Sequence, residues 1–335
     1  MKGRKSMTRK RFKTGIIYGG ILIGFLLLLV FPEYSSDSAR NGLEVCFRVI
    51  LPTLFPFFVL SSLIIDMDIA PLLGKLFSPF MRRLFNVPKD CGVVFLLGLL
   101  SGFPVGAKMT SEMYEKGLCS KNEADRLLCF SNNPSPGFVI SVVGGGILGS
   151  VTFGWLLFIS QTVAAVISGI LIAIIYKVSD SKHEYIPQRI EEKNNPNFAL
   201  CFTEAVKSGL SSVLNVCAFI VFFLMLTGLF EKLGVWSFLA SLFSFTGISP
   251  EIFKSIAAGF MEITSGASSV ANLSPRVAIP LLSMILGWSG LSVHFQVFAF
   301  SLKSGLSTKP YLLSKVMQAF IGGCLSLLAV IVMGF

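Results

Sequence analysis

The chain has 335 residues, of which 53% are hydrophobic and only 14% are charged, with a formal net charge of +10 at pH 7. This composition excludes the soluble globular classes, and the apolar runs that repeat along the whole length predict a polytopic α-helical membrane protein. The basic residues fall between the apolar runs, so membrane orientation explains them better than a nucleic-acid partner. The predicted partners are therefore the lipid bilayer and a small-molecule substrate, with a homo-oligomer left open.

The cysteines and histidines argue against a metal or redox site. The seven cysteines form no C-x-x-C pair and have no neighbouring histidine, and the two histidines, His183 and His294, are isolated. Zinc sites need clustered ligands at short spacings. No metal and no cofactor is predicted, although a coupling ion, H⁺ or Na⁺, is left open.

The N-terminal segment combines a basic head with an apolar stretch. Lys2–Lys13 is basic and Gly15–Phe31 is apolar, which resembles a signal peptide with a weak cleavage site at Ser36–Ala39. The apolar part is long for a signal peptide, so we favour an uncleaved first helix over residues 1–36, with the N-terminus in the cytoplasm. Pro32–Asn41 is predicted to be a short polar exit loop.

The next predicted elements are a kinked span and a surface helix. Leu43–Ile65 is long enough to cross a bilayer and contains Pro52 and Pro56, which are expected to kink the helix. Pro71–Val87 alternates apolar and basic residues, so we expect an amphipathic helix on the cytoplasmic surface.

The stretch Ser101–Lys108 interrupts a hydrophobic segment. The apolar run Val93–Leu100 is too short to cross a bilayer, which needs about 20 helical residues. Pro104 lacks a backbone N–H, and Gly102 and Gly106 tolerate dihedrals that a helix forbids. Because unpaired backbone is tolerated only where protein or a water-filled cavity covers it, we predict a re-entrant hairpin. A proline-kinked ordinary helix is the alternative.

A second interruption follows the polar stretch Thr110–Arg126. The apolar segment Leu127–Leu148 is broken at Ser131–Gly137, which predicts a broken transmembrane helix. The alternative is a surface loop with the span starting at Phe138. In a broken helix, three polar side chains would face a functional cavity at membrane depth, namely Asn132, Asn133 and Ser135.

A charged linker separates two halves with the same plan. Val151–Tyr176 is a span, and Lys177–Asn197 is the linker. We assign residues 37–176 to the first repeat, 177–198 to the linker and 199–335 to the second repeat. The second half is predicted to contain a span at Val206–Phe230, a surface helix at Leu233–Phe245, a hairpin at Ile256–Ala271, a span at Val277–Phe300 interrupted at Gly287–Gly290, and a final helix at Tyr311–Gly334.

The two interrupted segments resemble each other. Gly98–Ala107 and Gly259–Ala267 share a leading glycine, a polar centre and a Gly-Ala exit. Paired interruptions at corresponding positions of two halves point to a transporter site. The candidate substrate-binding residues are Ser101, Gly102, Gly106, Lys108, Asn132, Asn133, Ser135, Thr264, Ser265, Gly266 and Ser289.

Loop charges test the topology. With the N-terminus inside, the outer loops hold only Arg40, Lys232, Lys254 and Arg276. The inner loops hold the basic residues of Lys2–Lys13 and fifteen others: Lys75, Arg82, Arg83, Lys89, Lys108, Lys116, Lys121, Arg126, Lys177, Lys182, Arg189, Lys193, Lys303, Lys309 and Lys315. This bias is what the positive-inside rule requires. It places the two halves in opposite orientations. The predicted fold is therefore an all-α polytopic membrane protein of two inverted-topology repeats, each with a re-entrant hairpin and a broken transmembrane helix.

Three motifs carry a family resemblance. Ser101–Lys108 and Ser131–Gly137 resemble the sporulation integral membrane protein family called YlbJ or SpoVV, and the resemblance extends from about Phe31 to the C-terminus. Met261–Gly266 resembles the nucleoside-recognition "gate" domain shared with concentrative nucleoside transporters. The resemblance implies a transporter of dipicolinic acid, located in the bacterial cell membrane or the outer forespore membrane.

The chemistry of the tips leaves roles open for two charged residues. Hairpin tips present helix-end N–H groups that suit carboxylates. Lys108 either adds positive charge there or caps the hairpin at the inner surface. Glu262 is a candidate site for a coupling H⁺ or Na⁺, since a carboxylate beside an anion must be neutralised. In the nucleoside-transporter relatives, an acidic residue at a hairpin tip contacts substrate instead, and pairing with a neighbouring helix is the structural alternative.

Two other functions stay open. A carrier of nucleosides or other small metabolites is one, and a non-transporting membrane scaffold for spore assembly is another. An enzyme is not predicted. An intramembrane enzyme would need catalytic residues in the apolar segments, which have no paired acidic residues, and the sequence has no H-E-x-x-H and no G-x-S-x-G.

Overall fold

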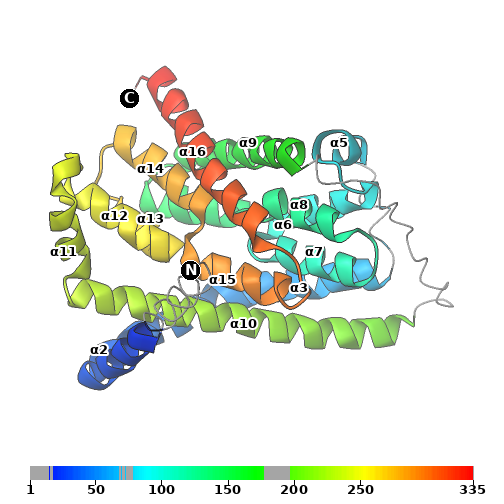
Figure 1. Ribbon diagram of the computed structural model, residues 1–335, viewed down its shortest axis with the longest axis horizontal. Helices are drawn as coiled ribbons and strands as arrows, with labels where there is room; N and C mark the ends of the chain where they lie inside the picture. Colours follow the sequence, from blue (N-terminus) through cyan, green and yellow to red (C-terminus); the bar gives the residue numbers. More distant parts are fainter. Residues whose placement is uncertain are drawn as a thin grey trace, which may run out of the picture.

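The computed structural model describes residues 15, 18–67, 69, 72, 78–176 and 197–334, and in this part of the chain every regular element is a helix (Figure 1). The predicted basic head at Lys2–Lys13 and nearly all of the linker lie outside these residues. Five helical stretches are long and apolar enough to cross a membrane, which confirms the all-α membrane class. They are Pro32–Asp66, Val151–Tyr176, Phe198–Lys232, Pro275–Ser301 and Thr308–Val332.

The first long helix begins earlier than the sequence suggested. A short apolar helix, Tyr18–Val30, is followed by α2 (Pro32–Val45), the π-helical segment η1 (Cys46–Ile50) and α3 (Leu51–Asp66). The prediction of an exit loop at Pro32–Asn41 was wrong. Proline is favoured at the first position of a helix, where no N–H is needed. Pro32 therefore starts the helix α2 and does not begin a loop.

The surface segment that follows is only partly described. It includes α5 (Ser78–Phe80), the π-helical η2 (Met81–Phe85) and the short 3-10 helix η3 (Lys89–Cys91). Met81 and Phe85 are buried while Arg82 and Arg83 are exposed, so the described part is amphipathic, as predicted.

The remaining elements of the first half contain both predicted breaks. They are α6 (Gly92–Ser101), α7 (Val105–Glu115), α8 (Lys121–Ser131), the π-helical η4 (Gly137–Ile147) and α9 (Val151–Tyr176). The polar stretch Thr110–Arg126 is therefore mostly helical, with only a short turn before α8. Ser120 and Glu123 explain the start of α8, since they form a reciprocal capping box.

The helices of the second half come in the predicted order. It contains α10 (Phe198–Lys232), α11 (Val235–Leu242), the 3-10 helix η6 (Ser244–Thr246), α12 (Pro250–Met261), α13 (Ile263–Ser269), α14 (Pro275–Trp288), α15 (Gly290–Ser301) and α16 (Thr308–Val332). α10 starts earlier than predicted because Asn197 caps it, accepting the N–H of Ala199 at 3.0 Å.

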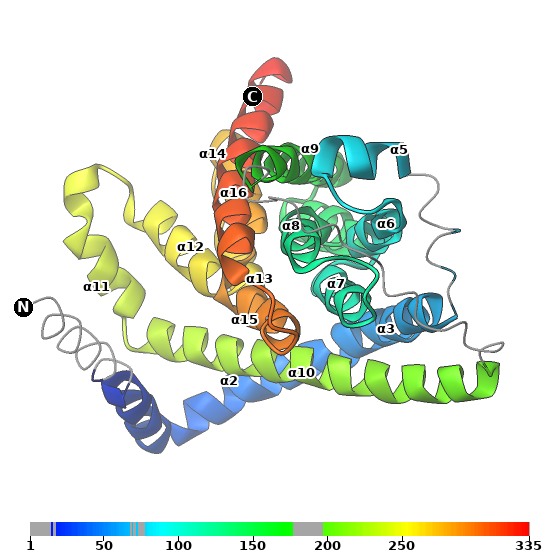
Figure 2. The same cartoon turned by 45° about the vertical axis from the view of Figure 1, so that its right-hand side comes forward.

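The long helices of the two halves lie side by side along one face of the molecule (Figures 1 and 2). Close contacts pair Gly42 with Val221, and Val59 with Gly209. The Cys46 thiol donates to the carbonyl of Cys217 at 3.7 Å. Since the partner's number falls as the residue number rises, α2–α3 and α10 run antiparallel.

Candidate functional site

The first tip is formed where α6 ends at Ser101 and α7 begins at Val105. Gly102 between them has φ +85°, a left-handed conformation that favours glycine. The two arms fold back on each other, because a Cβ added at Gly98 would lie 3.3 Å from the Cα of Gly106. The predicted interruption is thus present, and the leading and exit glycines of the motif are the residues in contact.

The break in α8 is attached directly to this tip. The Ser131 carbonyl sits against both glycines, Gly98 and Gly106, leaving no room for a side chain at either position. The Asn132 side-chain oxygen accepts the N–H of Ala107 at 3.2 Å. A Cβ added at Gly102 would lie 2.9 Å from the Cβ of Ser135. The structure therefore brings four of the predicted residues, Gly102, Gly106, Asn132 and Ser135, together in one cluster with Ser101 and Ser131.

Three polar groups of this cluster have no hydrogen-bond partner among the described residues. They are the hydroxyls of Ser101 and Ser131 and the side-chain nitrogen of Asn132. Ser101 is only 4% exposed and the other two are fully buried. Buried polar groups are nearly always bonded, so three unsatisfied donors at one break indicate a place for a ligand or water. By contrast, the Asn133 side chain is satisfied, because it donates to the carbonyl of Phe130 at 2.7 Å.

Lys315 is a buried residue of this cluster that is not among the residues predicted from the sequence. It was counted with the inner loops, but it is fully buried on α16. Its ammonium donates to the Asn132 carbonyl and, at 2.8 Å, to the side-chain oxygen of Gln318. It also lies 5.4 Å from the centre of the Phe103 ring. The helical spacing of Tyr311, Lys315 and Gln318 was the available signal, since together they form a polar stripe on one face of an apolar span.

Lys108 does not cap the hairpin at a surface, because it is buried within α7. Its ammonium pairs with Glu112 one turn later at 2.5 Å and donates to the hydroxyl of Ser62 on α3. It also lies 5.8 Å from the centre of the Phe58 ring. These contacts of Lys108 therefore tie α7 to α3 and give its charge a structural role.

Replacing Lys108 by methionine is expected to destabilise the protein by about 2 kcal/mol. Removing one partner of a fully buried pair costs roughly 3–5 kcal/mol. The cost is lower here because the Glu112 side chain is 22% exposed. The control is Lys116→Met, whose pair with Asp66 is about one-third exposed on both sides and should contribute below about 1 kcal/mol. Equal losses of melting temperature in the two variants would contradict this ranking.

The second tip is interrupted at a single residue. Glu262 separates α12 from α13, is 3% exposed, and caps α13 by accepting the N–H of Ser265 at 2.7 Å. No ion pair with Lys or Arg is found for it within the described ranges. A Cβ added at Gly266 would lie 2.7 Å from the nitrogen of Gly259, so the arms approach each other as in the first tip. Thr264 is half-buried.

The broken helix α14–α15 contacts the second tip. Ser289 separates its halves with φ +75°, and Gly290 follows with φ +80°. A Cβ at Gly290 would lie 3.3 Å from the Cα of Glu262. The Trp288 indole N–H donates to the Phe260 carbonyl at 3.1 Å, which anchors α12 to the end of α14. The predicted interruption at Gly287–Gly290 is confirmed.

Each half also packs on the other. The return arm α7 of the first tip contacts α15 (Figure 2). The return arm α13 of the second tip contacts η4. Phe103 at the first tip packs against both hydrophobic clusters of the core, and the second of these clusters includes Ile263. The two tips therefore belong to one packed unit.

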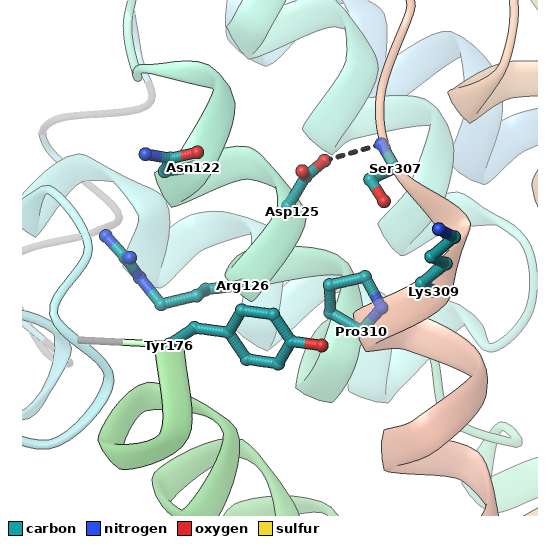
Figure 3. Close-up of a pocket in the computed structure, with 7 residues that line it drawn as sticks. All are labelled: Asn122, Asp125, Arg126, Tyr176, Ser307, Lys309 and Pro310. Atoms are coloured by element: carbon teal, nitrogen blue, oxygen red, sulfur yellow. Dashed lines mark hydrogen bonds between the residues drawn. The ribbon is translucent and has the colours of Figure 1, made fainter. Parts of the chain in front are cut away.

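A hollow lies at the start of α8 and α16, and none of the candidate site residues lines it (Figure 3). In it, the Asp125 carboxylate accepts the N–H of Ser307 at 2.8 Å, which fixes the start of α16 against α8. It is lined by Asn122, Asp125, Arg126, Tyr176, Ser307, Lys309 and Pro310.

Part of the first half is similar to a known family. Residues 47–178 match the Gate family, whose description is nucleoside recognition. The matched region contains the first tip, the interrupted helix α8–η4 and α9, and so it includes every candidate site residue of the first half.

The whole chain has relatives as well. It is 28% identical over 337 aligned residues to the sporulation integral membrane protein YlbJ of Bacillus subtilis (strain 168), with 93% of this chain and 81% of the relative covered. Two outward-facing variants of CNTnw match with TM-scores of 0.47, at 16% and 14% identity. They cover 96% and 95% of this chain, and 84% and 85% of theirs. The chain is an integral membrane protein related to a sporulation membrane protein.

Proposed function

We propose that this chain is a membrane transporter for a small anionic metabolite. The observation that carries the proposal is the buried ammonium of Lys315 beside three unsatisfied donors at the first tip. No ion pair with Asp or Glu is found for Lys315 within the described part of the chain. A buried charge without a counter-charge is costly, and an anionic ligand would neutralise it. The donors suit a carboxylate, which only accepts hydrogen bonds.

The architecture supports movement of the substrate between two sides of the membrane. We propose that the antiparallel long helices and the matching order of elements reflect inverted repeats, with two re-entrant hairpins and two broken helices enclosing a site near the midplane. Such repeats rock against each other around a fixed site and give alternating access. The contacts of α7 with α15 and of η4 with α13 fit this mechanism, because helices of each half pack against helices of the other.

Dipicolinic acid is the first candidate substrate. Its flat, doubly charged form would place one carboxylate on the donors of Ser101, Ser131, Asn132 and Lys315. The relation to a sporulation membrane protein supports this choice and the outer forespore membrane as the location. The amino end of α13 is not available to the second carboxylate, since Glu262 already occupies it.

Flux of labelled dipicolinate into vesicles containing the purified full chain tests the proposal. The parent is expected to release or accumulate the label under an H⁺ or Na⁺ gradient, above empty vesicles. No flux under any ion gradient would favour a membrane scaffold. Labelled nucleoside in parallel vesicles separates the two substrate classes.

Ser131→Ala is expected to lower flux while leaving stability unchanged or slightly higher. The hydroxyl has no partner in the described residues, so its removal relieves an unsatisfied group. A hydrogen bond to substrate worth about 0.5–1.5 kcal/mol corresponds to a loss of roughly 2- to 10-fold. The control is Ser326→Ala, a buried serine on α16 that donates to the Gly323 carbonyl at 3.0 Å. If the flux of Ser131→Ala equalled that of the parent, the Ser131 hydroxyl would not bind substrate.

A nucleoside is the second candidate substrate. Glu262 favours it, because a buried carboxylate without a basic partner in the described ranges accepts hydrogen bonds from hydroxyls, as a sugar would offer. The match of residues 47–178 to a nucleoside-recognition family points the same way. Stronger competition by nucleosides than by dicarboxylates in the vesicle assay would select this candidate.

A further inference from the structure

The carboxyl end of α8 presents backbone carbonyls that the break leaves without partners in the helix. Side chains of this chain satisfy them. The Cys129 carbonyl accepts the amide of Gln318 at 2.7 Å, and the Phe130 carbonyl accepts the amide of Asn133 at 2.7 Å. Such half-helix ends carry partial negative charge and are where broken helices of transporters coordinate a coupling cation.

At this end of α8 the carbonyl of Asn132, two residues after Phe130, accepts the ammonium of Lys315. Gln318 holds the ammonium in place, since its side-chain oxygen accepts from Lys315 at 2.8 Å while its nitrogen donates to α8. The rings of Phe103 and Tyr311 lie 5.4 and 5.9 Å from the charge and cover it. Lys315 is fully buried, so water does not reach the ammonium or the carbonyl that it contacts.

We propose that Lys315 is a tethered cation that occupies the cation position at the break in α8, so that no sodium ion binds there. Removing the side chain without filling its volume creates a site for an alkali cation. A metal ion beside the ammonium would be repelled in a low-dielectric interior, so the two are mutually exclusive. The consequence for transport, that no coupling sodium ion binds at the break in α8, rests on the function proposed above. The occupancy of the position does not.

The test measures the melting temperature of the purified full chain in sodium chloride and in choline chloride of equal ionic strength. The parent is expected to melt at the same temperature in both. Lys315→Ala is expected to melt lower in choline and to gain stability with the logarithm of the sodium concentration, as specific binding to the folded state requires. Lys315→Met is expected to show no sodium response, because its side chain fills the space without leaving room for an ion. The control Lys309→Ala removes a charge from an exposed position on the same helix and should behave as the parent.

Two outcomes overturn the inference. The first is a sodium response of the parent as large as that of Lys315→Ala, and the second is a folded Lys315→Ala without any response. If Lys315→Ala does not fold, binding of radioactive sodium to the parent and to Glu262→Gln decides. Saturable binding that both proteins share and that choline does not displace contradicts the tethered cation. None of these measurements involves flux. Failure of dipicolinate transport with the expected melting pattern would therefore refute the transport proposal alone.

Discussion

Replacing Gly106 by alanine is expected to destabilise the folded protein by more than about 3 kcal/mol, at the upper end of what overpacking costs. The added Cβ would fall on the Ser131 carbonyl group, 2.7 Å from its carbon and 3.1 Å from the serine hydroxyl. The obstacle is backbone, so no change of rotamer relieves it. Either α7 moves away from the break in α8 or the break itself moves, and both disturb the cluster of unsatisfied donors.

The measurement is the melting temperature together with the yield of monodisperse protein, with Gly137→Ala as the control. Gly137 begins η4, on the other side of the same break, and a Cβ there meets nothing within 4 Å. Alanine in an open helical position is neutral or stabilising by up to about 1 kcal/mol. The second tip provides a replicate, because Gly266→Ala places a Cβ 2.7 Å from the nitrogen of Gly259. If both tip variants melted like Gly137→Ala, the arms would not be closely packed in the folded protein.

The glycines show why the breaks could be predicted from the sequence. Helix interruption is a local property, since proline removes a donor and glycine permits a positive φ, and both are visible in the residues themselves. The breaks at Gly102, Ser131–Gly137, Glu262 and Ser289 therefore all appeared where expected. The role of the glycine pairs in closing each tip was not visible, because it depends on which arm lies opposite.

Charged residues were harder to place, because their surroundings depend on tertiary packing. Lys108 and Lys315 were both assigned to inner loops by charge counting, yet both are buried in helices. The positive-inside rule uses only the neighbourhood in sequence and does not distinguish a flanking lysine from one that faces a packed helix. The polar stripe of Tyr311, Lys315 and Gln318 at helical spacing is the signal that distinguishes a lysine facing a packed helix from one in a flanking loop. The prediction of a loop at Pro32–Asn41 was wrong for a related reason. A polar composition does not exclude a helix that packs on α10.

The Glu262→Gln variant is expected to lower flux about 10- to 100-fold with little change in melting temperature. A charged hydrogen bond contributes about 1.5–3 kcal/mol, which corresponds to that range. Glutamine keeps an oxygen that can accept the N–H of Ser265, so the cap of α13 is retained while the charge is lost. The control is Glu251→Gln, which neutralises an exposed carboxylate in the first turn of α12. If the flux of Glu262→Gln equalled that of the parent, Glu262 would act only as the cap of α13.

The same variant separates the two roles that a buried carboxylate can have at the second tip. If Glu262 carries the coupling ion, Glu262→Gln loses uphill accumulation but still exchanges labelled for unlabelled substrate, because exchange needs no net movement of the ion. If Glu262 holds the substrate, both activities fall together, since the bound state itself is weakened. Glu262→Asp keeps the charge but shortens the side chain by one methylene. Compared with Glu262→Gln, it is expected to restore ion-coupled accumulation more fully than it would restore a direct contact with substrate. Measuring exchange and accumulation on the three proteins in parallel assigns the role, and parent-like accumulation in Glu262→Gln would exclude both.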